Sequence, residues 1–112
     1  MPITNPDYTN LDHEVMAKAI GLKVKHMPML INSFLTESSP ILETMANQIQ
    51  EKDYEGVRAS AHSIKGSAGN LRFNELSEMA RELEYAATAG DSSFDYLGYL
   101  EAIKESIRTI TL

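Results

Sequence analysis

Residues 53–71 read Asp-Tyr-Glu-Gly-Val-Arg-Ala-Ser-Ala-His-Ser-Ile-Lys-Gly-Ser-Ala-Gly-Asn-Leu, and the spacing within this stretch decides the fold. Wound as an α-helix, at about 100° per residue, the stretch separates into two faces of different character. One face is apolar throughout, with members three or four residues apart, which predicts a helix packed on a core. That face consists of Val57, Ala61, Ile64, Ala68 and Leu71.

The opposite face holds an imidazole among small residues and two cations. Its members are Arg58, Ala59, His62, Lys65, Gly66 and Gly69. Gly66 lies inside the predicted helix, where glycine costs about 1 kcal/mol relative to alanine, and one turn after His62 it would leave the imidazole open to another protein. Gly69 either costs as much as Gly66 or lies close enough to the helix end to serve as its cap. Lys65, three residues after His62, is its neighbour on the helix surface and could reach an anion held near the ring. The face fits a histidine that exchanges phosphoryl groups with a partner.

The run from Ala61 to Leu71 resembles the signature of the histidine-containing phosphotransfer (HPt) domain, His-x-x-Lys-Gly followed by small residues. The pattern Leu-x-x-Met-Ala-x-x-Leu-Glu at 76–84 also matches the usual layout of that family, and the likeness covers roughly residues 25–108. The chain departs from it at 71–73, where Leu-Arg-Phe stands in place of the frequent Leu-Gly-Ala. We expect Phe73 to add apolar surface near the docking face.

The resemblance implies that His62 accepts a phosphoryl group. In this interpretation Nε2 of the neutral imidazole attacks an aspartyl phosphate on a receiver domain, and the phosphohistidine then donates to a second receiver. Lys65 would steady the phosphoryl oxygens by its charge, unless it is only a solvated surface residue. Arg58 could do the same, could steer an acidic receiver, or could be a plain surface charge. The remaining receiver-docking or access residues would be Ala59, Gly66, Gly69 and Phe73.

Composition limits the other classes of function. The 112 residues include no cysteine, and the net charge of −6 argues against nucleic acid or an anionic membrane as the main partner. Neither a membrane span nor a secretory signal is recognisable, so we expect a cytoplasmic protein, and a monomer. No Gly-rich phosphate loop is present, which predicts a carrier without kinase activity of its own. We expect no metal or other cofactor on this chain and magnesium on the receiver partner.

Two receiver partners follow from the resemblance, one belonging to a hybrid sensor histidine kinase and one to a response regulator. Two rival functions stay open: a phosphate-independent helical binding module and a hydrolase that depends on phosphohistidine or a metal. His13 and His26 are interpreted as surface residues. The carboxylates of Glu82 and Glu84 are interpreted as part of a solvated helix face.

In chain order, residues 1–10 predict an irregular leader and residues 11–112 a single domain. A short helix at about 11–20 would be capped by Asn10, stopped by Gly21 and buried through Leu11, Val15 and Ala19. A longer helical region at about 25–51 contains Pro40. Either one kinked helix continues through this proline, which the apolar phase favours, or Ser39 caps a new helix there.

The central helix, capped by Asp53, is followed by a helix that begins at Asn74 as its N-cap and stops near 89–91. A last helix spans about 93–109, with Leu97 among its apolar residues. Four long amphipathic segments joined by short turns predict an all-α fold. The expected architecture is an antiparallel up-down-up-down four-helix bundle with a short additional N-terminal helix.

Overall fold

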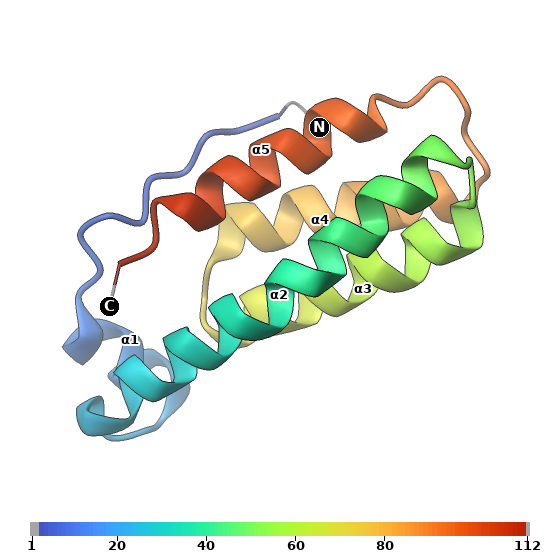
Figure 1. The fold of residues 1–112 in the computed structure, drawn as a ribbon. Helices are drawn as coiled ribbons and strands as arrows, with labels where there is room; N and C mark the ends of the chain where they lie inside the picture. Colours follow the sequence, from blue (N-terminus) through green and yellow to red (C-terminus); the bar gives the residue numbers. More distant parts are fainter. Residues whose placement is uncertain (1–2, 112) are drawn as a thin grey trace.

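The computed structural model describes residues 3–111, and over this range the chain contains helices and no strand. The elements are α1 (His13–Ile20), a 3-10 turn η1 (Val24–His26), α2 (Met27–Gln50), α3 (Tyr54–Asn70), α4 (Asn74–Thr88) and α5 (Tyr96–Arg108). Figure 1 shows α2 to α5 running alternately up and down in an elongated bundle, with α1 across one end. The predicted all-α four-helix bundle with an additional short helix is confirmed. The predicted leader includes residues 1 and 2, and the predicted domain includes residue 112; these three residues lie outside the described residues.

The apolar face predicted for the central helix is buried as a unit in α3. Val57, Ala61, Ile64 and Ala68 are fully buried, and Leu71 just beyond the helix is 7% exposed. The predicted buried residues of α4 are likewise in the core: Leu76, Met79, Ala80, Leu83 and Ala87. Asp53 caps α3 as expected, since its carboxylate accepts a hydrogen bond from the backbone N–H of Gly56 at 3.0 Å. The position of the opposite, functional face of α3 is therefore fixed by its core face.

Helix α2 continues through Pro40 as a single element, so Ser39 does not start a new helix. Proline removes one backbone donor, but Pro40 lies on the exposed side of the helix. The buried residues before and after it stay in phase, as Phe34 and Leu42 show. Packing of the buried residues on both sides of Pro40 outweighs the lost hydrogen bond.

The expected start and rotation of α1 were wrong. Asp12, rather than Asn10, is the N-cap, and its carboxylate accepts from the backbone N–H groups of Glu14 and Val15. The buried residues are Met16 and Ala17, whereas Val15 is 63% exposed and Ala19 is also exposed. Because this short helix covers only one end of the bundle, few of its positions touch the core. Gly21 stops it in the left-handed conformation, as predicted.

Phe73 is buried, which contradicts its expected place on a docking surface. It is 1% exposed, and its ring lies 4.6 Å from that of Tyr8 and 5.6 Å from that of Phe34. The turn before Phe73 directs its side chain into the core and places Arg72 at a positive φ of 65°, a conformation that glycine adopts with less strain. Phe73 then occupies the N-cap position of α4, and Asn74 becomes the first helical residue instead of the cap.

The expected start of the last helix and the expected burial of Leu97 need correction. Helix α5 starts at Tyr96, where the side chain of Asp95 caps it, and Leu97 is 60% exposed while Tyr99 is buried. The leader contains no helix between residue 3 and residue 12, yet it lies along α5 (Figure 1). Its Tyr8 donates a backbone N–H to Oγ1 of Thr109 at 2.9 Å. The leader therefore contributes to the packing of the domain.

Candidate functional site

His62 lies in the middle of α3 with its imidazole open to solvent. The side chain is 63% exposed, although the helix that bears it is buried along its other face. A Cβ built on Gly66, one turn further along, would have no atom within 4 Å. The surface beside the ring is thus open, as the sequence predicted.

A carboxylate from the neighbouring helix holds this imidazole. Oε2 of Glu84 on α4 lies 2.8 Å from Nδ1 of His62, and Oε1 of the same residue lies 2.7 Å from Nζ of Lys65. The Glu84 side chain is only 12% exposed. Its interpretation as a solvated surface charge was therefore wrong. One carboxylate connects the two residues that the sequence had singled out for phosphoryl chemistry.

The charge on Glu84 determines which nitrogen of the ring is free. Burial raises the pKa of this carboxyl, but the contacts from Lys65 and His62 outweigh burial and lower the pKa below its ordinary value. An ionised carboxylate can only accept hydrogen bonds, so Nδ1 of His62 carries the proton. In the neutral ring Nε2 then has the lone pair, and it lies on the part of the ring away from Glu84.

Lys65 and Arg58 differ in their partners. Lys65, with 30% of its side chain exposed, pairs with Glu84 within the site. Arg58 donates to Glu55 from Nε at 3.1 Å and from Nη2 at 2.6 Å, one turn toward the start of α3. This hydrogen bond lowers the pKa of the Glu55 carboxyl. Arg58 is thus engaged by Glu55 on the predicted face, whereas Lys65 is held beside the imidazole.

The two glycines of the face have different surroundings. Gly66 borders open space, whereas a Cβ on Gly69 would lie 3.3 Å from Oγ of Ser77 on α4. The absent side chain at Gly69 therefore allows α3 and α4 to approach closely. Oγ of Ser77 also donates to the backbone carbonyl of Lys65 at 2.9 Å, which ties the two helices together at the site. Gly69 is not a helix cap, because α3 continues to Asn70.

Ala59 lines a shallow apolar groove between α2 and α3. The groove has a volume of about 330 Å³, and its other lining residues are Pro40, Ile41, Thr44, Ser60 and Ser63. Ala59 lies three residues before His62, and residues at this spacing are neighbours on a helix surface, so the groove borders the face of α3 that bears the imidazole. An apolar surface next to a reactive side chain suits contact with another protein.

Among residues 3–111, no group of three or more His, Cys, Asp or Glu side chains is arranged to hold a metal ion. Within the same range, none of the helices combines the length and apolar character needed to cross a membrane.

An exposed histidine on a helical bundle, with its ring held by a carboxylate and a lysine nearby, defines a candidate phosphoryl-accepting site. The family model for the Hpt domain matches residues 29–109. The chain therefore belongs to the Hpt domain family, a family of histidine phosphotransfer carriers.

Two kinds of relatives illustrate this membership. The crystal structure of histidine-containing phosphotransfer protein B (HptB) from Pseudomonas aeruginosa PAO1 superimposes with a TM-score of 0.76 and 26% sequence identity, covering 88% of this chain and 84% of that chain. Sensor protein EvgS from Escherichia coli O157:H7 and from strain K12 is 24% identical over 102 residues. These residues make up 91% of this chain but 8% of EvgS, so the chain spans a small part of the curated relatives that it matches.

Proposed function

We propose that His62 is the residue that carries the phosphoryl group, received from an aspartyl phosphate of one receiver domain and passed to the aspartate of another. The observation that supports this assignment most is the contact of Nδ1 with the ionised Glu84, which leaves Nε2 as the free nucleophile on an exposed ring. Neither His13 nor His26 lies on this face of α3.

The transfer needs no external base, because no proton has to leave the ring when Nε2 attacks. The lone pair of Nε2 forms the N–P bond while the P–O bond to the receiver's aspartate breaks and the aspartate leaves as a carboxylate. The imidazole gains positive charge in this step because Nδ1 keeps its proton. Glu84, 2.8 Å from Nδ1, stabilises that charge. In the reverse direction the N–P bond breaks and the ring becomes neutral again, so the same contact serves both transfers.

Lys65 supplies the positive charge for the phosphoryl oxygens. Its Nζ pairs with Glu84, which keeps the ammonium next to the ring before a receiver arrives. A positive charge that is already near the reacting atoms needs little reorganisation during transfer. The phosphoryl group then competes with Glu84 for this ammonium.

The receiver domain would dock over the open part of α3 and the groove beside it. Gly66 has free space at its Cβ position, and Ala59 lines the apolar groove between α2 and α3. We assign the partners to a hybrid sensor kinase and a response regulator in the cytoplasm, acting on a monomer of this chain. Magnesium would be bound by the receiver, and the chain would have no kinase activity of its own.

The direct test is transfer of radiolabelled phosphate from a phosphorylated receiver. The wild-type chain should gain label that is labile to acid and stable to base, and His62→Gln should gain none while keeping its helicity. A double variant, His13→Gln with His26→Gln, is the matched control and should label normally. Label that persists on His62→Gln would refute the assignment. A chain that binds the receiver and is never labelled would instead be a phosphate-independent binding module.

A further inference from the structure

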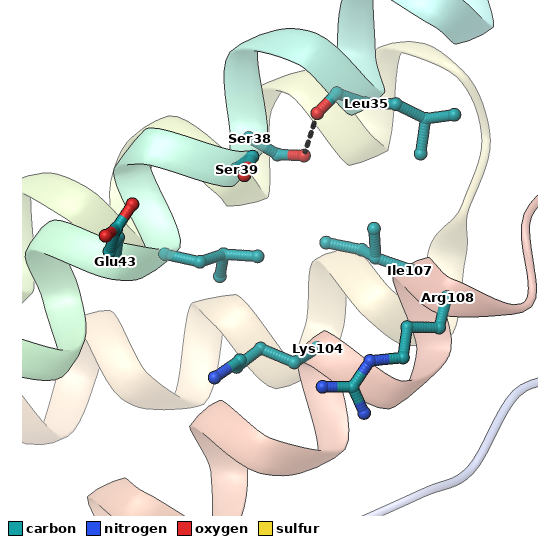
Figure 2. Close-up of a pocket in the computed structure, with 8 residues that line it drawn as sticks. Leu35, Ser38, Ser39, Glu43, Lys104, Ile107 and Arg108 are labelled. Atoms are coloured by element: carbon teal, nitrogen blue, oxygen red, sulfur yellow. Dashed lines mark hydrogen bonds between the residues drawn. The ribbon is translucent and has the colours of Figure 1, made fainter.

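A hollow of about 270 Å³ lies between α2 and α5, and it shares no lining residue with the candidate phosphotransfer site. Figure 2 shows Lys104 and Arg108 on its α5 side and Ser38 and Glu43 on its α2 side. The lining also includes Ser39 and three apolar side chains: Leu35, Leu42 and Ile107. The hollow therefore combines an apolar surface with two cations on one side.

The hollow coincides with a small polar residue in the buried stripe of α2. Ser38 lies four residues after Phe34 and four before Leu42, and it is 2% exposed. Its Oγ donates to the backbone carbonyl of Leu35 at 3.3 Å. A larger apolar side chain would ordinarily fill such a position, because unfilled space in a core lowers stability. Ser38 thus leaves room between the helices at the expense of packing.

The two cations beside the hollow each pair with an exposed glutamate of the same helix. Lys104 lies 3.8 Å from Glu101, and Arg108 pairs with Glu105. All four side chains are at least 36% exposed, and exposed pairs of this kind contribute little to stability. Lys104 and Arg108 are four residues apart, so they lie on the same side of α5. An anion in the hollow would compete with Glu101 and Glu105 for these two cations.

We propose that this hollow binds a small amphipathic carboxylate. The apolar chain of the ligand would lie against Leu35, Leu42 and Ile107, and its single carboxylate would pair with Lys104 and Arg108. Glu43 on the opposite side disfavours a second negative charge, which selects a monoanion. The volume is just below the roughly 300–1,000 Å³ of pockets for drug-sized ligands, so one short alkyl chain fits.

Octanoate is a suitable probe, with 1-octanol as the neutral molecule of the same length. Both are titrated into the full chain, below the concentration at which octanoate forms micelles, while backbone amide shifts are followed by NMR. Octanoate should shift amides within residues 35–43 and 104–108 and should bind roughly tenfold more tightly than octanol, because the carboxylate gains charge-assisted hydrogen bonds. The double variant Lys104→Gln with Arg108→Gln should lose this preference. Lys25→Gln, an exposed cation outside the hollow, should keep it.

Filling the hollow provides the second arm of the test. Ser38→Leu should abolish the octanoate shifts without lowering the melting temperature, whereas Ser38→Ala, which preserves the space, should still bind. If Ser38→Leu does not fold, the exposed charge variants decide the outcome. Equal affinity for octanoate and octanol, shifts located elsewhere, or unchanged binding by the double variant would overturn the proposal. Shifts that depend on protein concentration alone would assign this face to a second copy of the chain and would overturn it as well.

Discussion

Replacing Glu84 by glutamine changes the charge next to His62 with little change of shape. The amide keeps an oxygen that can accept from Nδ1 of His62, now 2.8 Å from Oε2, but it loses the ionic contribution. A hydrogen bond to a charged group contributes about 1.5–3 kcal/mol, against about 1 kcal/mol for a neutral pair. The difference of roughly 1–1.5 kcal/mol corresponds to a rate of transfer about tenfold lower. Glu84→Ala, which removes the contact altogether, should slow transfer about a hundredfold.

The assay is the initial rate at which label passes from a phosphorylated receiver to the chain after rapid mixing. Circular dichroism of the same samples establishes that the variants are folded. Glu75→Gln, an exposed carboxylate in the first turn of the same helix, is the matched control and should transfer at the wild-type rate. If a folded Glu84→Gln transfers as fast as the wild type, charge at Nδ1 does not contribute to the reaction and the reasoning fails.

Four further outcomes follow from the structure. Gly66→Gln should stabilise α3 by several tenths of a kcal/mol, since no atom lies within 4 Å of the added Cβ. The long side chain should nevertheless displace the docked receiver, and a displacement of about 1 Å should slow transfer around a hundredfold. Thermal melts and transfer assays on one preparation test both effects, and normal transfer would contradict the open-approach argument. Lys65→Ala should slow transfer by raising the activation free energy about 1–3 kcal/mol, while the fold persists. Wild-type kinetics in this variant would make Lys65 a plain surface charge. Phe73→Ala should lower the free energy of unfolding by about 3–5 kcal/mol in urea melts, because the ring of Phe73 is 1% exposed. If this loss is smaller than the loss caused by Leu97→Ala, at an exposed position, the ring of Phe73 is outside the core. Because the pKa of Glu84 is lowered in the folded chain, the stabilising effect of its carboxylate is present above the ordinary value of 4.5 and is lost as the pH falls through the lowered value. The wild type should therefore lose more stability than Glu84→Gln over that range. Urea midpoints that change in parallel for the two proteins would contradict the pairing.

The fold was predictable where a helix has a long, uninterrupted apolar stripe. The residues of α3 from Val57 to Ala68 and those of α4 from Leu76 to Ala87 recur at three or four positions, and each predicted member is buried. Periodicity also identified α2 as one helix, because the apolar phase on the two sides of Pro40 agrees. A helix of eight residues such as α1 carries too few positions for the same argument, so its rotation was wrong.

The site was only half predictable, since it joins two helices. His62, Lys65 and Gly66 belong to one helix, where spacing alone places them on the same face. Glu84 belongs to another helix and borders the stripe formed by Ala80, Leu83 and Ala87. Whether such a bordering carboxylate turns toward a neighbouring helix or toward water depends on packing between helices, which periodicity does not describe. Its position directly after Leu83, in the pattern that resembles the family, was the signal that could have found it.

Phe73 shows a different limit. Its chemistry is apolar in either environment, and the direction of its side chain depends on the turn before it. Arg72 adopts a positive φ of 65°, a conformation that sequence propensity disfavours for a residue with a side chain. The core formed by Tyr8, Phe34 and Phe73 compensates for that strain, and two of its three rings come from distant parts of the chain.

The central claim is that the phosphoryl group is bonded to Nε2 of His62 while Nδ1 keeps its proton next to Glu84. It is tested most directly by NMR of the ¹⁵N-labelled chain after phosphorylation by a receiver. The account predicts that the phosphorus couples to Nε2 of His62 and that the Nδ1 proton is present and protected from exchange. Coupling to Nδ1, or a phosphorus bonded to any other residue, would contradict it.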